Sequence, residues 1–147
     1  MDQESRMRRM YDDWMTMWNG DTSLAHKLVA RDCPVHQPPN NAVGPEGVVQ
    51  MVEMGRAPFE TITFSIEIEP IIQNEWLAAR WIGAGRYRGG MPGATVAPGT
   101  EITFRGNDIW RVEDEQIAEY WVSSDGIHLL MQLGILPPAN SVAPPPH

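Results

Sequence analysis

The stretch WVSSDGIHLLMQLG, residues 121–134, joins an apolar strand pattern to an apolar helix pattern. Ile127 and Leu130 recur at helical spacing, and Gly134 supplies a helix stop. Asp125 lies at the junction between the two patterns. A carboxylate among apolar neighbours is a candidate acid or base, because the loss of hydration disfavours its charged form. The competing interpretation is a helix N-cap, in which the carboxylate accepts the first free N–H groups of the helix.

Strand periodicity dominates the residues that precede this junction. Hydrophobic and polar side chains alternate most clearly in residues 61–69. The segment 89–99 is rich in glycine and proline and is too flexible to form a regular element, so it is expected to be a lid or a hairpin loop. The expected strands are residues 61–69, 76–88, 101–112 and 116–124, the last two joined by a turn at 113–115.

Helical periodicity dominates the first third of the chain. Residues 4–19 place methionine, tyrosine and tryptophan side chains at the three-and-four spacing of one helix face. A short second helix is expected to end at Ala30, and Pro45 opens a third helix over 45–55. Residues 33–39 should be extended or turning, because residues before proline avoid the helical region of the backbone.

Helices followed by a run of strands are typical of an α+β fold, with the helices segregated to one side of a mainly antiparallel sheet. A single domain is expected over residues 1–136, and the tail at 137–147 holds five prolines and is expected to be disordered. One cysteine, Cys33, excludes an internal disulfide framework and suits a reducing cytoplasm. Its CxxH spacing to His36 lacks a second ligand pair, so no metal site is expected.

Charge and hydropathy exclude two classes of partner. Nineteen acidic against eleven basic residues give a net charge of -8, which makes binding to nucleic acid unfavourable. The sequence has no run of eighteen apolar residues and no apolar signal segment near its start. A cytoplasmic protein without membrane association is therefore expected.

Six tryptophans and nine methionines in 147 residues indicate a large amount of contoured apolar surface. Such side chains can line a hydrophobic cavity, or they can simply fill a core. The first interpretation predicts a substrate pocket lined by Trp14, Trp18, Met51, Trp81, Met91, Phe104, Trp121 and Leu129.

Several short motifs share their order and spacing with one family. They are GPEG at 44–47, GRYRG at 85–89, PGT at 98–100, and W-x-x-x-D followed by QLG within 121–134. Together they resemble the SnoaL-like polyketide cyclases. The resemblance implies a strongly curved sheet wrapped around N-terminal helices, a cone with an enclosed hydrophobic pocket, and a homodimer that covers the outer face of the sheet.

The same resemblance gives Asp125 a catalytic acid-base role. Tyr87 stands where the family pattern has a histidine that helps to polarise substrate oxygen, and a phenol can donate a hydrogen bond there but is a poor base at pH 7. His36 follows a proline-stiffened segment, where it could face the cavity and relay protons or only bond a backbone carbonyl. The candidate catalytic residues are therefore Asp125, His36 and Tyr87.

The leading hypothesis is a cofactor-independent cyclase that closes a ring in a hydrophobic polyketide intermediate. Either Asp125 drives an aldol closure, or the pocket acts as a template for a cycloaddition. One alternative is an epoxide hydrolase, hydratase or isomerase. The epoxide chemistry needs Arg105 between Asp108 and Asp125, although the odd spacing from 105 to 108 places those two side chains on opposite strand faces. A further alternative is a non-catalytic module that binds an apolar ligand.

Overall fold

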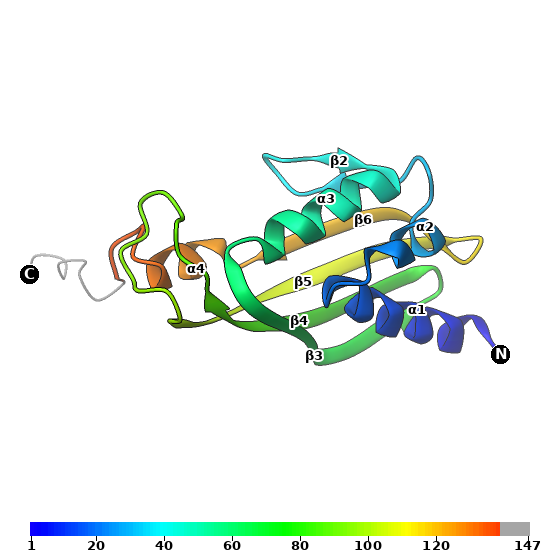
Figure 1. The fold of residues 1–147 in the computed structure, drawn as a ribbon. Helices are drawn as coiled ribbons and strands as arrows, with labels where there is room; N and C mark the ends of the chain where they lie inside the picture. Colours follow the sequence, from blue (N-terminus) through cyan, green and yellow to red (C-terminus); the bar gives the residue numbers. More distant parts are fainter. Residues whose placement is uncertain (139–147) are drawn as a thin grey trace, which may run out of the picture.

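The computed structural model describes residues 1–138, which form one curved sheet with helices packed against it (Figure 1). The helical elements and the strands follow one another in a simple order along the chain. The helices are α1 (Gln3–Trp18), η1 (Thr22–Leu24), α2 (Ala25–Leu28), α3 (Gly44–Arg56) and α4 (Gly126–Gln132). The strands are β1 (Pro34–His36), β2 (Ala42–Val43), β3 (Phe59–Gln73), β4 (Trp76–Tyr87), β5 (Glu101–Glu113) and β6 (Gln116–Ser124).

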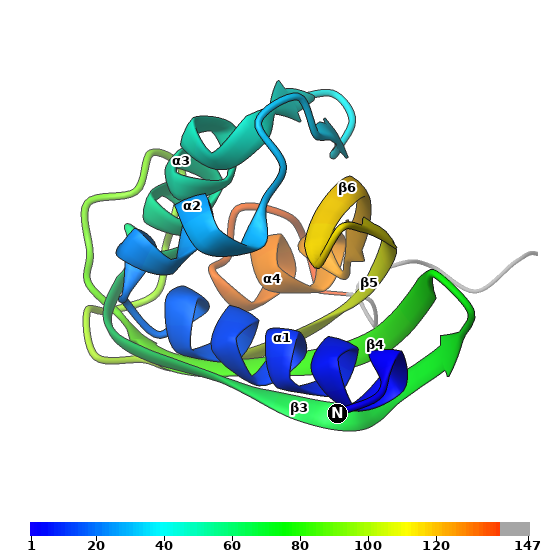
Figure 2. The same cartoon turned by 90° about the vertical axis from the view of Figure 1, so that its right-hand side faces the viewer.

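The sheet has six strands in the order β2-β1-β6-β5-β4-β3. Strands β3 to β6 form an antiparallel meander, whereas β1 pairs with β6 in parallel. The register of β3 against β4 shifts at Ile66/Ile68 and Ile68/Ile71, and such irregularities bend a strand and increase its twist. Figure 2 shows the sheet curving around α1, with α3 above the same face. The expected α+β cone is therefore confirmed, and its sheet remains open at the β3 edge.

The core lies between α1 and the concave face of the sheet. Tyr11 and Trp14 of α1 are fully buried, as are Trp110 and Tyr120 of the central strands. Most helix and strand positions that the periodicity predicted to face inward do so, but Met54 of α3 and Ile127 of α4 are 68% and 69% exposed. Ile68 is 49% exposed, because the register shifts on either side of it turn it away from the core.

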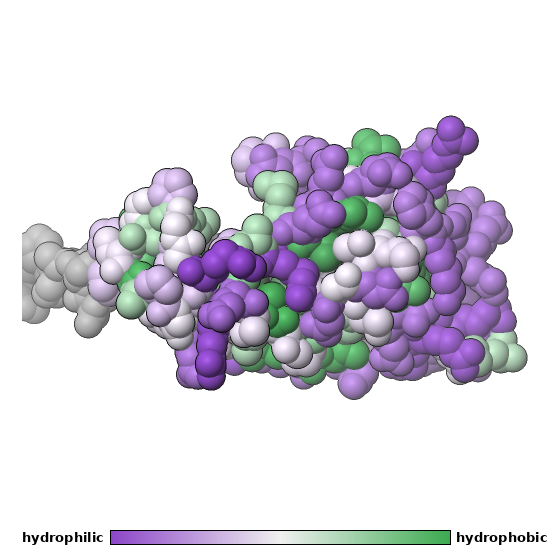
Figure 3. Space-filling view, viewed as in Figure 1, coloured by the Kyte–Doolittle hydropathy of each residue, from purple (hydrophilic) through white to green (hydrophobic). Residues whose placement is uncertain are grey.

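The expected extended segment before α3 contains two short strands, β1 and β2, that join the sheet. No helix among the described residues is long and apolar enough to cross a membrane. Figure 3 shows a largely hydrophilic face, with hydrophobic side chains reaching the surface in small areas near its middle. The proline-rich tail falls mostly in residues 139–147, outside the described part of the chain.

Candidate functional site

A cavity of about 730 Å³ lies between α3, the inner face of β3 to β6 and α4. Nearly every element of the fold contributes to its apolar wall, because side chains on the inner face of β3 to β6 meet the side chains of α3. Met54, which is 68% exposed, forms part of the rim, so the cavity communicates with solvent. The apolar lining side chains include Trp18, Met51, Met54, Phe59, Phe64, Trp81, Met91, Phe104, Val122 and Leu129.

Aromatic rings form the floor of this cavity in a cluster of edge-to-face contacts. The rings of Trp81 and Phe104 lie 5.6 Å apart at 88°, and both meet Phe64, at 5.6 and 6.0 Å. Edge-to-face geometry is favourable for aromatic pairs beyond the area that they bury. Gly83 makes the cluster possible, because a Cβ at that position would lie 3.0 Å from the Phe64 ring and 3.2 Å from the Phe104 ring.

The polar side chains of the lining are neutral. They come from the loop after β1, from α3 and from the end of β6, and none of the described lining residues carries an ionisable side chain. Amide and hydroxyl groups can both donate and accept hydrogen bonds to a carbonyl or hydroxyl of a ligand. The polar lining residues are Gln37, Asn40, Asn41, Gln50 and Ser124.

Six of the eight predicted contact residues line the cavity, namely Trp18, Met51, Trp81, Met91, Phe104 and Leu129. The other two placements are corrected by the structure. Trp14 lies one layer deeper, fully buried between Trp110 and Tyr120. Trp121 follows the inward-facing Tyr120 on β6, so it points to the outer face of the sheet, where it contacts Trp76.

The Asp125 side chain is absent from the cavity lining, against the prediction that its carboxylate would face the pocket. Oδ1 accepts a 2.8 Å hydrogen bond from the backbone N–H of Arg105, and Oδ2 lies 3.6 Å from His128 Nδ1. The side chain makes no capping hydrogen bond to α4, although the residue occupies the N-cap position. Asp125 therefore fastens the end of β6 to β5 beside the cavity.

His36 lies on the outer face of the sheet, which corrects its predicted place at the cavity. Its ring stacks on Trp121 at a centroid distance of 5.1 Å, and Nε2 lies 2.8 Å from a Glu119 carboxylate oxygen. The preceding residue, Val35, is the one that points inward from β1. His36 is thereby separated from the cavity by the thickness of the sheet.

Tyr87 is buried at the end of β4, and its hydroxyl oxygen accepts a 2.8 Å hydrogen bond from the backbone N–H of Met91. The hydroxyl therefore anchors the loop 89–99 rather than facing the cavity. Thr95 ties the same loop to the C-terminal end of α4, because its N–H donates to the Leu133 carbonyl at 3.0 Å. Met91 reaches the cavity from this anchored loop.

Asp108, which the sequence suggested only for the epoxide hydrolase alternative, is the buried charged residue among the described residues. It is 1% exposed, and its carboxylate accepts hydrogen bonds from Tyr120 Oη at 2.6 Å, Tyr11 Oη at 2.8 Å and Trp14 Nε1 at 3.3 Å. Burial raises the pKa of Asp108 to about 6, against the opposing effect of these hydrogen bonds. Its even-numbered position on β5, shared with Phe104, was the available signal that it faces inward.

Arg105 points to the opposite face of β5 and donates to Glu67 Oε2 at 2.6 Å. An arginine between the carboxylates of Asp108 and Asp125 is therefore not assembled, which corrects that part of the epoxide hydrolase alternative.

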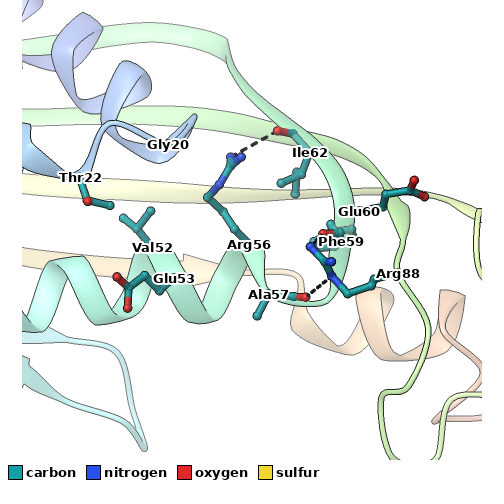
Figure 4. A pocket seen from close by; sticks show the side chains of 10 residues that line it. All are labelled: Gly20, Thr22, Val52, Glu53, Arg56, Ala57, Phe59, Glu60, Ile62 and Arg88. Carbon is teal, nitrogen blue, oxygen red and sulfur yellow. Dashed lines mark hydrogen bonds between the residues drawn. The ribbon is translucent and has the colours of Figure 1, made fainter.

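A smaller pocket of about 360 Å³, drawn in Figure 4, shares Phe59 with the cavity as a lining residue. Arg56 Nη1 donates to the Trp18 carbonyl at 2.8 Å and to the Ile62 carbonyl at 3.3 Å. Arg88 Nε donates to the Ala57 carbonyl at 3.3 Å. These arginines fasten the ends of α1 and α3 to β3, so this pocket is a structural junction.

A cone-shaped α+β domain with an open, largely apolar and neutral cavity has the features that are typical of small-molecule sites. The model of the SnoaL-like polyketide cyclase family matches residues 5–133, and the chain belongs to that family.

Solved structures agree on the fold. TsrD from Streptomyces laurentii is 21% identical, with a TM-score of 0.77 over 92% of this chain and 99% of that one. IdmH from Streptomyces antibioticus, a candidate polyketide cyclase, is 24% identical, with a TM-score of 0.74 over 90% and 99%. AclR from Streptomyces galilaeus, a candidate hydroxylase, is 19% identical, with a TM-score of 0.78 over 94% and 86%. No curated protein sequence matches the chain.

Proposed function

We propose that the protein is a cofactor-independent cyclase that closes a ring in a hydrophobic polyketide intermediate of natural-product biosynthesis, with the cavity acting as a template. The observation that carries the proposal is the cavity of about 730 Å³ whose described lining is apolar or neutral. Membership of the SnoaL-like family supports the cyclase class. The proposal thus selects between two mechanisms that the sequence left open.

A template mechanism matches this lining because it moves no proton. In a cycloaddition, two carbon–carbon bonds form as π bonds of the same substrate are consumed, and no atom leaves or enters. The acceleration comes from holding the reacting ends in contact, and well-oriented intramolecular reactions reach effective molarities on the order of 10⁵ M or more. Side chains such as Trp81, Phe104 and Leu129 would fold a flexible polyene so that its ends meet.

The aldol mechanism is less well supported, because it needs a base within reach of a substrate carbon. Asp125 is the candidate for that base, and it lies outside the lining with one oxygen bonded to the Arg105 backbone. Asn at this position would keep the hydrogen bond from Arg105 but could not remove a proton. Asp125→Asn therefore separates the two mechanisms. The variant should lose ring closure if the reaction is an aldol closure and should keep it if the reaction is a cycloaddition.

The proposal is tested by incubating the protein with a synthetic linear triene that carries an unsaturated ketone, and by measuring the rate and stereochemistry of ring closure. Leu129→Trp places a larger ring in the cavity and should reduce the acceleration at least tenfold. Ile127→Trp is the matched control, because Ile127 lies on the same helix and is 69% exposed. Equal rates with and without wild-type protein, for a triene that binds, would instead support the non-catalytic binding module.

The outer face of the sheet supports the proposal that the protein is a homodimer. Large hydrophobic side chains are exposed there, and exposed apolar side chains that gather on one face are typical of an interface. Trp76 and Trp121 contact each other within it, at a centroid distance of 5.8 Å. The exposed residues of this face are Ile68, Ile71, Trp76 and Ile109.

Sedimentation equilibrium would test the dimer. Ile109→Asp should shift the wild-type dimer to monomer, whereas Val43→Asp should leave it unchanged, because Val43 is 62% exposed on β2, away from this patch. A monomeric wild type would contradict the dimer and would leave the proposed cyclase activity unaffected.

A further inference from the structure

Asp108 lies behind the cavity, and its hydrogen bonds join α1 to the two central strands. Oδ1 accepts from Tyr120 of β6, while Oδ2 is shared by Tyr11 and Trp14 of α1. All of these donors are buried, so the carboxylate has exchanged water for a set of protein donors. A buried carboxylate is costly unless such a set is complete.

Trp81 connects this carboxylate to the cavity. It pairs with Gly106 on β5, two residues before Asp108 on the same inner face. The indole lies against Gly106 so closely that a Cβ there would be 2.2 Å from Trp81 Cζ2 and 2.6 Å from Cε2. Trp81 is close enough to Asp108 to lower the pKa of its carboxyl, the smallest such effect after those of Tyr120, Tyr11 and Trp14. The same ring forms part of the cavity floor.

A second connection runs through Trp14. Its indole N–H donates to Asp108, and its ring meets Trp18 edge-on at a centroid distance of 6.4 Å. Trp18 lines the cavity and packs against Phe64 at 5.2 Å. Two cavity rings therefore lie near one carboxylate: Trp18 contacts it through Trp14, and Trp81 packs on Gly106 of the strand that carries Asp108.

We propose that Asp108 is a positioning residue of the cyclase, whose carboxylate sets the orientation of Trp81 and Trp18 and so determines which folded conformer of the substrate is closed. This inference rests on the proposed function. Only an ionised carboxylate offers about four acceptor sites and no donor, which matches a site in which every neighbour donates. An asparagine would keep one acceptor oxygen and bring two N–H donors toward the hydroxyls of Tyr11 and Tyr120.

The orientation of Trp81 can be tested without a substrate, by near-ultraviolet circular dichroism of the full chain. Asp108→Asn should change the tryptophan bands, and most of that change should be absent when the same substitution is made in a Trp81→Phe background. Ile117→Ala is the matched control, because Ile117 is fully buried at the far end of β6 and should lower stability without changing these bands. The inference would be overturned if Asp108→Asn changed the tryptophan bands equally in the Trp81→Phe protein and in the wild-type protein.

Diphenylhexatriene, a neutral conjugated polyene, probes the consequence for the cavity. We expect Asp108→Asn to weaken its binding about tenfold and to alter the dichroism induced in the bound probe, and Ile117→Ala to do neither. Unchanged affinity and induced dichroism would overturn the positioning role. If Asp108→Asn does not fold, the wild-type protein supplies the test. Its tryptophan bands should change between pH 4 and 7 as Asp108 loses its proton. Bands that stay constant over this range would refute the inference.

A wild-type protein that does not bind the probe would contradict the proposed function rather than this inference. The tryptophan bands would still decide whether Asp108 orients Trp81.

Discussion

Replacing Asp108 by asparagine should remove a specific pH dependence from the stability of the protein. The pKa of Asp108 is raised from 3.8 to about 6 by burial, a difference of about two units, which corresponds to about 3 kcal/mol. Between these two values the folded protein holds a proton that the unfolded chain has released. Unfolding then releases a proton, so the free energy of unfolding falls as the pH rises.

The contribution of Asp108 is therefore fully present below pH 3.8 and is lost as the pH rises through about 6. Asp108→Asn has no such group. The free energy of unfolding of the wild type, minus that of the variant, should fall by about 3 kcal/mol between pH 4 and 7. The subtraction cancels the carboxylates that both proteins share, and it also cancels any loss in the variant that does not depend on pH.

Urea unfolding followed by tryptophan fluorescence, repeated at half-unit steps of pH, measures this difference. A difference that stays constant across the range would show that Asp108 does not titrate there in the folded state. A difference that grows with pH would show that the hydrogen bonds from the two tyrosines and Trp14 outweigh burial, and that the sign of the argument is wrong.

Three further predictions concern the cavity and its loop. Gly83→Val should destabilise the protein by about 1–3 kcal/mol in thermal unfolding and weaken diphenylhexatriene binding, because the added carbons meet the rings of Phe64 and Phe104; unchanged binding would show that these rings can move apart. Tyr87→Phe removes the acceptor for the Met91 N–H and should cost about 1 kcal/mol, with faster amide hydrogen exchange confined to residues 89–99; exchange rates equal to those of the wild type would contradict its anchoring role. Asp125→Asn should close the triene at close to the wild-type rate, and a loss of a hundredfold or more would restore the acid-base role of this residue.

The strands were predictable because their side chains alternate. Strand β6 was predicted with the bounds that the structure has, and the face of α1 that carries Tyr11 and Trp14 is buried as its spacing indicates. The assignment of faces on β6 was the weaker step. Tyr120 and Trp121 are both large and aromatic, so periodicity alone did not decide which of them points inward, and an error of one residue moves a side chain through the sheet.

The candidate site was predictable in its apolar part and not in its polar part. Trp18, Met51 and Phe104 could be assigned because hydrophobic residues at inward positions meet wherever the sheet curves. The surroundings of a carboxylate, in contrast, depend on contacts between distant segments. Asp108 bonds to Tyr11, 97 positions away, and Asp125 bonds to the backbone of Arg105, 20 positions away. Neither contact leaves a local pattern in the sequence.

The neutral lining of the cavity has a consequence for how such a catalyst could diversify. Because the described lining has no protonation state to maintain, one apolar side chain can replace another there without disabling a chemical step. Met51, Met91 and Leu129 each come from a different part of the fold, so exchanges among leucine, methionine and phenylalanine at these positions would reshape the space independently. Variation at these positions would change which product forms while the fold and the mode of catalysis persist.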